Sequence, residues 1–102
     1  MKIIIAGDGK VGSTLARELS AEGYEITVVD SSREVLEATE EAYDLMTVTG
    51  NCASMDVLAH ADIHSADLLI AATSADEINL LCCVTAHYMN PKLHTIARIR
   101  NP

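Results

Sequence analysis

The feature that most constrains the fold of this chain is a regular recurrence of short apolar segments. Their starts are separated by roughly 20 to 27 residues, the spacing of units in which a strand alternates with a helix. Three of them, IIIA, ITVV and LLIAA, are almost continuously apolar, as parallel strands covered on both faces are. The predicted strands are Lys2–Ala6, Glu25–Asp30, Leu45–Thr49, Asp67–Ala72 and His94–Ile99.

Helix-type patterns occupy the intervals between these segments. Apolar residues at every fourth position predict a first helix from Lys10 to Glu22, ended by Gly23. Serine followed three residues later by glutamate predicts capping boxes that begin the second and fourth helices at Ser31 and Ser74. The side chains expected on inner helical faces are Val35, Leu36 and Thr39 in the second helix, and Met55 and Leu58 in a short third helix over 54–60.

The fourth helix is expected to end near Met89, before Asn90-Pro91, and it contains the apolar run Leu80–Val84. Five consecutive apolar residues cover more than one face of a helix, so this helix packs on a second surface besides the sheet. Two interpretations have equal weight, a cover formed by further chain or a contact between subunits.

This alternation predicts an α/β fold, with a Rossmann-like, doubly wound parallel sheet of order 3-2-1-4-5 and helices on both faces. A full fold of this type has a sixth strand, which we expect to be missing here. Residues 1–102 are therefore interpreted as one nucleotide-binding domain of a longer chain.

Composition excludes several classes of protein. The chain carries 15 acidic and 7 basic residues and a net charge of −8, which opposes binding to nucleic acid or to anionic membranes. No apolar run exceeds five residues, so neither a membrane span nor a signal peptide is expected, and the prediction is a cytoplasmic protein without membrane insertion. The three cysteines show no spacing of a disulfide framework.

A glycine-rich loop lies between the first predicted strand and helix. In this context the G-x-G-x-x-G pattern is typical of dinucleotide binding. The first glycine makes the tight turn, the second lets backbone amides approach a pyrophosphate, and the third lets the helix pack close to the strand. The helix N-terminus adds oriented N–H groups for phosphate. The loop consists of Gly7, Asp8, Gly9, Lys10, Val11 and Gly12.

Asp30 ends the second predicted strand, 18 residues after Gly12. In this fold a carboxylate at that position accepts hydrogen bonds from the ribose 2′- and 3′-hydroxyls and repels a 2′-phosphate. We therefore expect NAD(H) rather than an NADP-type ligand. A helix-capping role for Asp30 is the alternative, and the two roles are compatible.

Further candidates lie at the ends of the other strands. Thr73 and Ser74 follow the fourth strand at the switch point of the sheet, where ligands bind, although Ser74 also fits a helix cap. Arg98, in the fifth strand, needs either a ligand phosphate or a structural carboxylate as its partner. Asn51 and Cys52 follow the third strand and border the adenine region, with a plain loop as the alternative.

The cysteines are not expected to act as redox groups. Cys52 has no basic neighbour in sequence that would lower the pKa of its thiol. Cys82 and Cys83 are interpreted as core residues. Likewise, His60 and His64 are not expected to form a metal site, because the short helix ends between them.

Taken in order, the segments MKIIIAGDGKVGSTLA, ITVVD, YDLMTVTGN, DLLIAATSADEINLL and IARIRNP resemble the N-terminal nucleotide-binding (RCK or KTN) domain of Trk-type potassium-uptake regulators. The resemblance implies a cytoplasmic, membrane-peripheral regulator that binds NAD(H) or ADP/ATP. It also implies a homo-oligomeric ring that gates a membrane potassium transporter subunit. Ala53 departs from the family, in which serine or threonine is frequent. The nucleotide contacts that the resemblance implies are Gly7 to Val11, Asp30, Thr73, Ser74 and Arg98, and Asn51 matches a position that borders the adenosine.

Two functions remain to be weighed, a regulatory nucleotide-binding module and the cofactor domain of an NAD-dependent dehydrogenase. A dehydrogenase needs a substrate pocket and a positioned acid or base. The sequence offers no such constellation, so we expect a regulatory module and not an enzyme.

Overall fold

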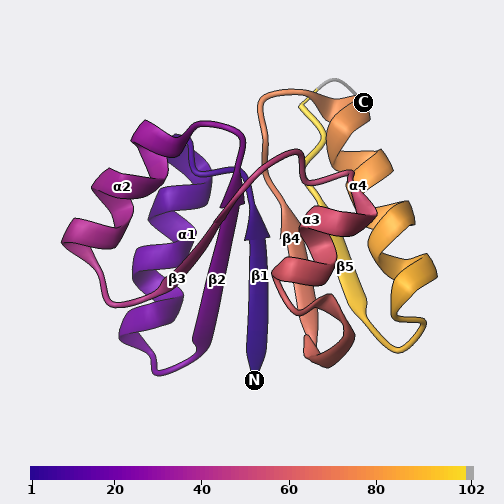
Figure 1. Ribbon diagram of the computed structural model, residues 1–102, viewed down its shortest axis with the longest axis horizontal. Helices are drawn as coiled ribbons and strands as arrows, with labels where there is room; N and C mark the ends of the chain where they lie inside the picture. Colours follow the sequence, from indigo (N-terminus) through magenta and orange to yellow (C-terminus); the bar gives the residue numbers. More distant parts are fainter. Residues whose placement is uncertain (101–102) are drawn as a thin grey trace.

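The five-stranded sheet has the order β3-β2-β1-β4-β5, and every neighbouring pair is parallel (Figure 1). This order and these pairings confirm the predicted fold class and strand order. The computed structural model describes residues 1–100. The elements are β1 (Lys2–Ala6), α1 (Lys10–Ala21), β2 (Glu25–Asp30), α2 (Arg33–Ala42), β3 (Met46–Thr49), α3 (Met55–His60), the 3₁₀ turn η1 (Ile63–Ser65), β4 (Leu68–Ala71), α4 (Asp76–Met89) and β5 (His94–Ala97).

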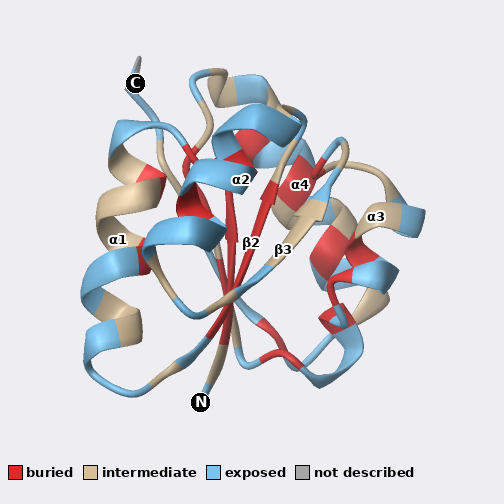
Figure 2. Ribbon diagram, turned by 60° about the vertical axis from the view of Figure 1, so that its left-hand side comes forward, coloured by how far each residue is buried: buried red, intermediate tan, exposed pale blue. Residues whose placement is uncertain are grey.

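The central strand β1 divides the core into two layers, because successive side chains of a strand point to opposite faces. Ile3 and Ile5 pack in a cluster with Ala16 of α1 and Leu36 of α2. Ile4 lies in the opposite cluster, which contains residues of α3 and α4. Figure 2 shows burial concentrated along the strands and on the inner sides of the helices. Covering both faces explains why β1, β2 and β4 are almost continuously apolar, whereas the edge strands β3 and β5 contain polar and exposed residues.

Two predicted helix starts are wrong. The N-cap of α2 is Ser32, whose hydroxyl accepts from the Val35 amide at 3.3 Å, and not Ser31. Helix α4 begins after Ala75, and no side chain caps it. Ser74 therefore lies in the loop before α4, because hydrogen bonds of Thr73 hold the backbone in a turn there.

Some predicted details of burial and length also differ. Met55 is 49% exposed and Val35 is 39% exposed, because each lies on the outer side of its helix. Strand β5 ends at Ala97, two residues earlier than predicted, so Arg98 follows the strand instead of lying in it. Gly23 does follow α1, with a φ of +92°. Asn101 and Pro102 lie outside the described residues.

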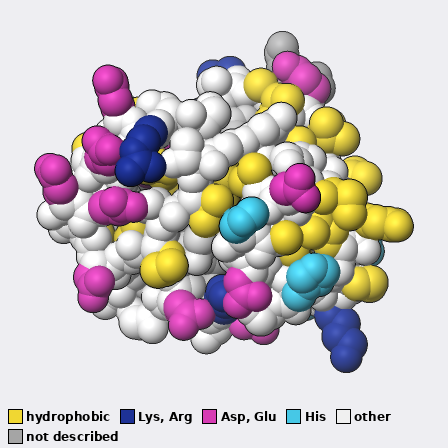
Figure 3. Space-filling view, viewed as in Figure 1, with side chains coloured by type: hydrophobic (Ala, Val, Ile, Leu, Met, Phe, Trp, Pro, Cys, Tyr) yellow, Lys and Arg dark blue, Asp and Glu magenta, His cyan; other side chains and the backbone are white. Residues whose placement is uncertain are grey.

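The outer side of α4 exposes Leu80, Leu81, Val84 and Tyr88, whereas Cys82 on the inner side is fully buried. Figure 3 shows hydrophobic side chains gathered on this side of the molecule. The apolar run in the sequence thus covers two faces of the helix, as predicted.

Candidate functional site

A cavity of about 750 Å³ opens where the strand order reverses, at the carboxyl ends of the strands. Parallel α/β sheets bind ligands at this point, and the volume is within the usual range for small-molecule sites. The lining residues are Gly7, Gly9, Lys10, Val11, Val29, Asp30, Ser31, Gly50, Asn51, Cys52, Ala72, Thr73, Ser74, Ala75, Ile78, Arg98 and Arg100.

The glycines of the loop after β1 have separate steric roles. Gly7 has a φ of +105°, and a Cβ there would lie 2.9 Å from the amide nitrogen of Thr73. A Cβ on Gly12 would lie 1.8 Å from the carbonyl oxygen of Gly7, so only glycine lets α1 start this close to the loop. Gly9 meets no atom within 4 Å, and its open side lines the cavity. The backbone is therefore bare where a ligand would approach it.

Helix α1 directs its first turn at this cavity. Its N-cap, Gly9, makes no side-chain cap, and no acidic residue lies in the first turn. The first N–H groups of a helix have no partner within the helix and carry a partial positive charge. Lys10 and Val11 line the cavity beside them. This end of the molecule thus attracts anions, although the net charge of the chain is −8.

Asp30 at the end of β2 is held in one orientation by two backbone donors. Its Oδ2 accepts from the Asp8 amide at 2.7 Å, and its Oδ1 accepts from the Ser32 amide at 2.8 Å. A carboxylate oxygen can accept more than one hydrogen bond, so both oxygens keep capacity for ligand hydroxyls. The bond to Ser32 also fits the alternative role beside the start of α2.

The side chain of Asp8 does not line the cavity, so it is not placed to contact a ligand there. It is buried against α2, where its Oδ2 accepts from the Thr39 hydroxyl and its Oδ1 has no hydrogen-bond partner in the described part of the chain. Burial raises the pKa of Asp8; the Thr39 hydrogen bond opposes this, and the nearby Asp30 charge adds to it. Gly12 also lies behind the cavity wall. Both residues belong to the loop that was predicted to bind a dinucleotide. Gly12 has the packing role expected of the third glycine, and the Asp8 side chain supports the loop from behind.

Asn79 on α4 organises the opposite wall, and sequence reasoning missed it. Its Oδ1 accepts from the Thr73 amide at 2.8 Å and the Thr73 hydroxyl at 2.7 Å. Its Nδ2 donates to the carbonyls of Thr73 at 3.1 Å and Arg98 at 2.9 Å. The fully buried amide therefore joins the β4–α4 loop to the segment after β5. The available signal was a single asparagine within an apolar helical stretch.

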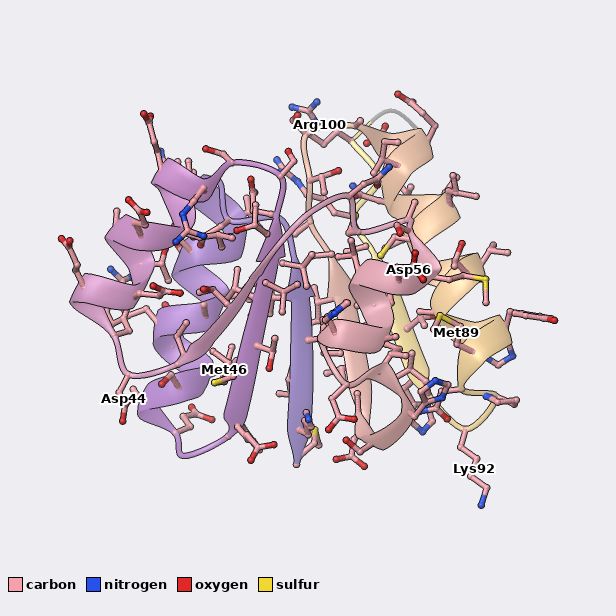
Figure 4. The ribbon with its side chains drawn as sticks, in the orientation of Figure 1. Asp44, Met46, Asp56, Met89, Lys92 and Arg100 are labelled. Atoms are coloured by element: carbon pink, nitrogen blue, oxygen red, sulfur yellow. The ribbon has the colours of Figure 1, made fainter. Side chains whose placement is uncertain are left out.

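Two arginines lie on this wall, and only Arg98 was predicted. Arg98 follows β5, and its amide donates to the Ala71 carbonyl at 2.8 Å. Arg100 donates from its guanidinium to the Ser74 carbonyl and from its amide to Asp76 Oδ1 at 3.1 Å. Figure 4 shows Arg100 at the end of the molecule where these loops meet. Together with Lys10 near the N-terminus, these two arginines line the cavity with cations from both ends of the chain.

The loop after β3 closes the third side. Asn51 Oδ1 accepts from the Ala53 amide at 2.9 Å and so stabilises a local turn, the structural role expected of a plain loop. Both Asn51 and Cys52 also line the cavity, with Cys52 only 5% exposed.

Within residues 1–100, no group of three or more His, Cys, Asp and Glu side chains is placed to hold a metal ion. No helix there has the length and apolar character needed to cross a membrane.

The chain as a whole is similar to known proteins in both sequence and structure. The model of the TrkA-N domain matches residues 3–102. The Trk system potassium uptake protein TrkA of Vibrio alginolyticus is 42% identical over 102 residues, which are 100% of this chain and 22% of that protein. The TrkA homolog of Pyrococcus abyssi is 36% identical over 102 residues, 100% of this chain and 45% of that protein. The chain thus spans less than half the length of these curated relatives.

Solved structures agree with this match. The Shewanella denitrificans Kef CTD in its AMP-bound form is 32% identical with a TM-score of 0.84, covering 99% of this chain and 60% of that one. The TrkA-N domain of the inner membrane protein ybaL from Escherichia coli is 27% identical with a TM-score of 0.89, covering 95% and 71%. The GsuK channel is 26% identical with a TM-score of 0.85, covering 99% and 18%. The family model matches residues 3–102, and the strand order and the glycine loop are consistent with that match. The chain therefore belongs to the TrkA-N family of RCK N-terminal, Rossmann-type domains.

Proposed function

We propose that this chain is a regulatory domain that binds NAD(H) or ADP/ATP in the cavity at the switch point and controls a membrane potassium transporter. One observation carries the proposal. The bare backbone at Gly9, the start of α1 and the oriented carboxylate of Asp30 line one cavity. Together they provide a phosphate site and a ribose site on one wall, as an adenine nucleotide requires.

The ligand class follows from the charges in the cavity. Asp30 favours free ribose hydroxyls and repels a 2′-phosphate, which selects NAD(H) over NADP(H). Lys10, Arg98 and Arg100 face the same space and suit a pyrophosphate or a triphosphate. The structural neighbour in AMP-bound form supports an adenine nucleotide. In this proposal the contacts are the backbone of residues 7–11, with Asp30, Asn51, Cys52, Thr73, Ser74 and Arg98, joined by Arg100.

The partner in this proposal is a potassium-transporting membrane protein, contacted from the cytoplasmic side by several copies of the domain. Relatives named as Trk system potassium uptake proteins and a structural neighbour named as a channel support it. Domains of this family are regulatory and not catalytic, as the sequence analysis predicted. A nucleotide then acts by shifting the domain between conformations, which requires different contacts in each.

The test is calorimetric titration of the purified chain with NADH, NAD, ADP, ATP and NADPH, repeated with Asp30→Ala. Hydrogen bonds to a charged group contribute about 1.5–3 kcal/mol, so Asp30→Ala should weaken NADH binding by roughly ten- to a hundredfold. NADPH should bind the original chain more weakly than NADH does. Asp44→Ala removes an exposed carboxylate away from the cavity and serves as the matched control.

Circular dichroism would verify that each variant is folded. A folded Asp30→Ala variant with unchanged affinity contradicts the ribose assignment. No binding of any of the five nucleotides by the original chain contradicts the proposed function.

A further inference from the structure

One buried side-chain amide joins two segments that border the cavity. Asn79 lies near the start of α4, where this helix packs on β4 and β5, and it does not itself line the cavity (Figure 1). Its Oδ1 accepts from the amide and the hydroxyl of Thr73, and its Nδ2 donates to the carbonyls of Thr73 and Arg98. An asparagine side chain has two acceptor positions and two donor hydrogens, so all four are used. A buried amide satisfied in this way holds its partners in one arrangement.

On the β4 side, Thr73 is held by its backbone and by its side chain. A hydroxyl has one hydrogen to donate, and Asn79 Oδ1 at 2.7 Å is closer to it than the Ala75 carbonyl at 3.2 Å. The same hydroxyl oxygen accepts from the Ala75 amide at 3.3 Å. Thr73 therefore presents a fixed surface to the cavity and keeps no free hydrogen-bond donor.

On the β5 side, Arg98 is held by both of its backbone groups. Its amide donates to the Ala71 carbonyl at 2.8 Å, just beyond the end of β5, and its carbonyl accepts from Asn79 at 2.9 Å. Arg98 lines the cavity, and its guanidinium has no hydrogen-bond or ion-pair partner among residues 1–100. The backbone is thus fixed at the residue whose charge is left free for a ligand.

We propose that Asn79 is a positioning residue for the phosphate side of the cavity. It contacts no ligand itself, but it fixes the Arg98 backbone relative to the β4–α4 loop and so sets where the guanidinium meets a phosphate. A cation that is already held in place loses less conformational freedom when it binds, and affinity rises accordingly. This inference rests on the proposed function and deepens it, because it names the group that orients the phosphate contact.

The opposite end of α4 provides a matched comparison. Asn90 directly follows the last residue of α4, and its Nδ2 donates to the carbonyls of Ile63 at 3.0 Å and Ala66 at 3.1 Å. At 1.5 Å per residue, it lies about 16 Å along the helix from Asn79. It does not line the cavity. Both asparagines thus join carbonyls of separate segments, and only Asn79 does so beside the cavity.

The experiment replaces each asparagine with aspartate and measures the affinity for NAD, and for ADP in parallel, by titration calorimetry. In Asn79→Asp one oxygen still accepts from Thr73, but the other now faces the carbonyls of Thr73 and Arg98 in place of a donor. At mildly alkaline pH we expect binding to weaken roughly ten- to a hundredfold, as for loss of one charged hydrogen bond. Asn90→Asp should keep both affinities within about twofold of the original values.

The pH profile distinguishes positioning from a general loss of packing. Burial and the two facing carbonyls raise the pKa of the new carboxyl at position 79, because they disfavour its charged form. As the pH falls through that pKa, the carboxyl gains a hydrogen that it can donate to the Arg98 carbonyl. The affinity of Asn79→Asp divided by that of the original chain should therefore rise towards one on acidification. The same ratio for Asn90→Asp should not change with pH.

These ratios cancel the titration of the ligand and of the charged groups around the two segments. Those groups are Asp76 and Glu77 of α4, Arg98 and Arg100 after β5, and Lys10 and Asp30 across the cavity.

A measurement on the original chain keeps the inference testable if circular dichroism shows that Asn79→Asp does not fold. The side-chain amide hydrogens of Asn79 are buried and bonded, so NMR should show them exchanging with solvent at least roughly a hundredfold more slowly than those of the exposed Asn51. On addition of NAD the side-chain Nε signal of Arg98 should shift, while the Asn79 hydrogens stay protected.

Unchanged affinity in a folded Asn79→Asp variant, equal weakening by Asn90→Asp, or an affinity ratio independent of pH would each overturn the inference. Exchange of the Asn79 hydrogens as fast as those of Asn51 would overturn it as well. If the original chain binds neither NAD nor ADP, the proposed function fails, and the role of Asn79 in phosphate binding fails with it. The exchange measurement then still decides whether the amide joins the two segments.

Discussion

At the scale of single residues, Asp8 shows how a side chain can serve a site without contacting its ligand. Its backbone amide fixes the Asp30 carboxylate at 2.7 Å, while its own carboxylate is buried beside Thr39. One oxygen has no partner within the described part of the chain. A buried carboxylate with an unpaired oxygen is costly in its charged form, so its protonation favours the folded state.

We therefore expect Asp8→Asn to change how stability depends on pH. Burial raises the pKa of Asp8 above its ordinary value of 3.8, so between the two pKa values the folded state binds a proton that the unfolded chain has released. The free energy of unfolding of the original chain thus falls, relative to that of the variant, as the pH rises from about 3.8 through the raised pKa. Urea unfolding of both proteins between acidic and neutral pH measures this difference.

Asp44→Asn, at an exposed position, controls for the loss of one charge. A difference between Asp8→Asn and the original chain that stays constant over the whole pH range would contradict this explanation.

At the scale of elements, the turn from β1 into α1 combines two requirements in six residues. Gly12 is needed because the start of the helix packs against the loop, whereas Gly9 is needed because its open side faces the cavity. The same residue type therefore serves folding at one position and ligand approach at the other. The two roles are separable by experiment because the steric surroundings differ so much.

Alanine at each glycine should separate these roles. Gly12→Ala would place a Cβ 1.8 Å from the Gly7 carbonyl oxygen, and overpacking of this kind costs about 1–3 kcal/mol or more. At Gly9 the backbone has a φ of −76°, which alanine adopts without strain, so its stability should change by less than about 1 kcal/mol. Nucleotide affinity should nevertheless fall, because the added Cβ stands between the backbone and the phosphate.

Urea unfolding measures the first effect, and calorimetry the second. Equal losses of stability in the two variants would show that the steric difference between these positions has no effect on folding.

At the scale of the whole molecule, an acidic protein gathers cations at one cavity. The net charge of −8 opposes the approach of an anionic nucleotide. Lys10, from the start of α1, and Arg98 and Arg100, from the segment after β5, line the same space. Their proximity depends on the sheet order, which places β1 and β5 on either side of β4.

Arg98→Gln should therefore weaken ATP binding by roughly ten- to a hundredfold, as expected for loss of a charged hydrogen bond, and leave adenosine binding unchanged. Lys92→Gln removes the same charge from an exposed residue at the opposite end of the molecule and should leave both affinities unaltered (Figure 4). Titration calorimetry at constant salt gives both values. Equal weakening by the two variants would mean that overall charge, and not the position of Arg98, governs binding.

Much of this architecture follows from local patterns in the sequence. The recurrence of apolar segments predicts the parallel sheet and its order, because handedness rules leave few ways to connect such units. The glycine spacing predicts the turn from β1 into α1. The sequence separation of Asp30 from that turn predicts its position at the end of β2. These features depend on periodicity and on backbone sterics, which a short stretch of residues determines by itself.

The tertiary structure alone decided which distant groups share an environment. Asn79 bonds to Thr73 and to the carbonyl of Arg98, 19 residues away, and Arg100 reaches Ser74, 26 residues away. Cys52 and Cys82 belong to one core cluster, although no sequence pattern links them. Such contacts depend on the packing of helices against the sheet, and a hydrogen bond or a shifted pKa arises only once that packing brings the atoms together. The sequence by itself therefore determined the frame and the position of the cavity, and the packed structure determined which side chains lie together around it and how they are oriented.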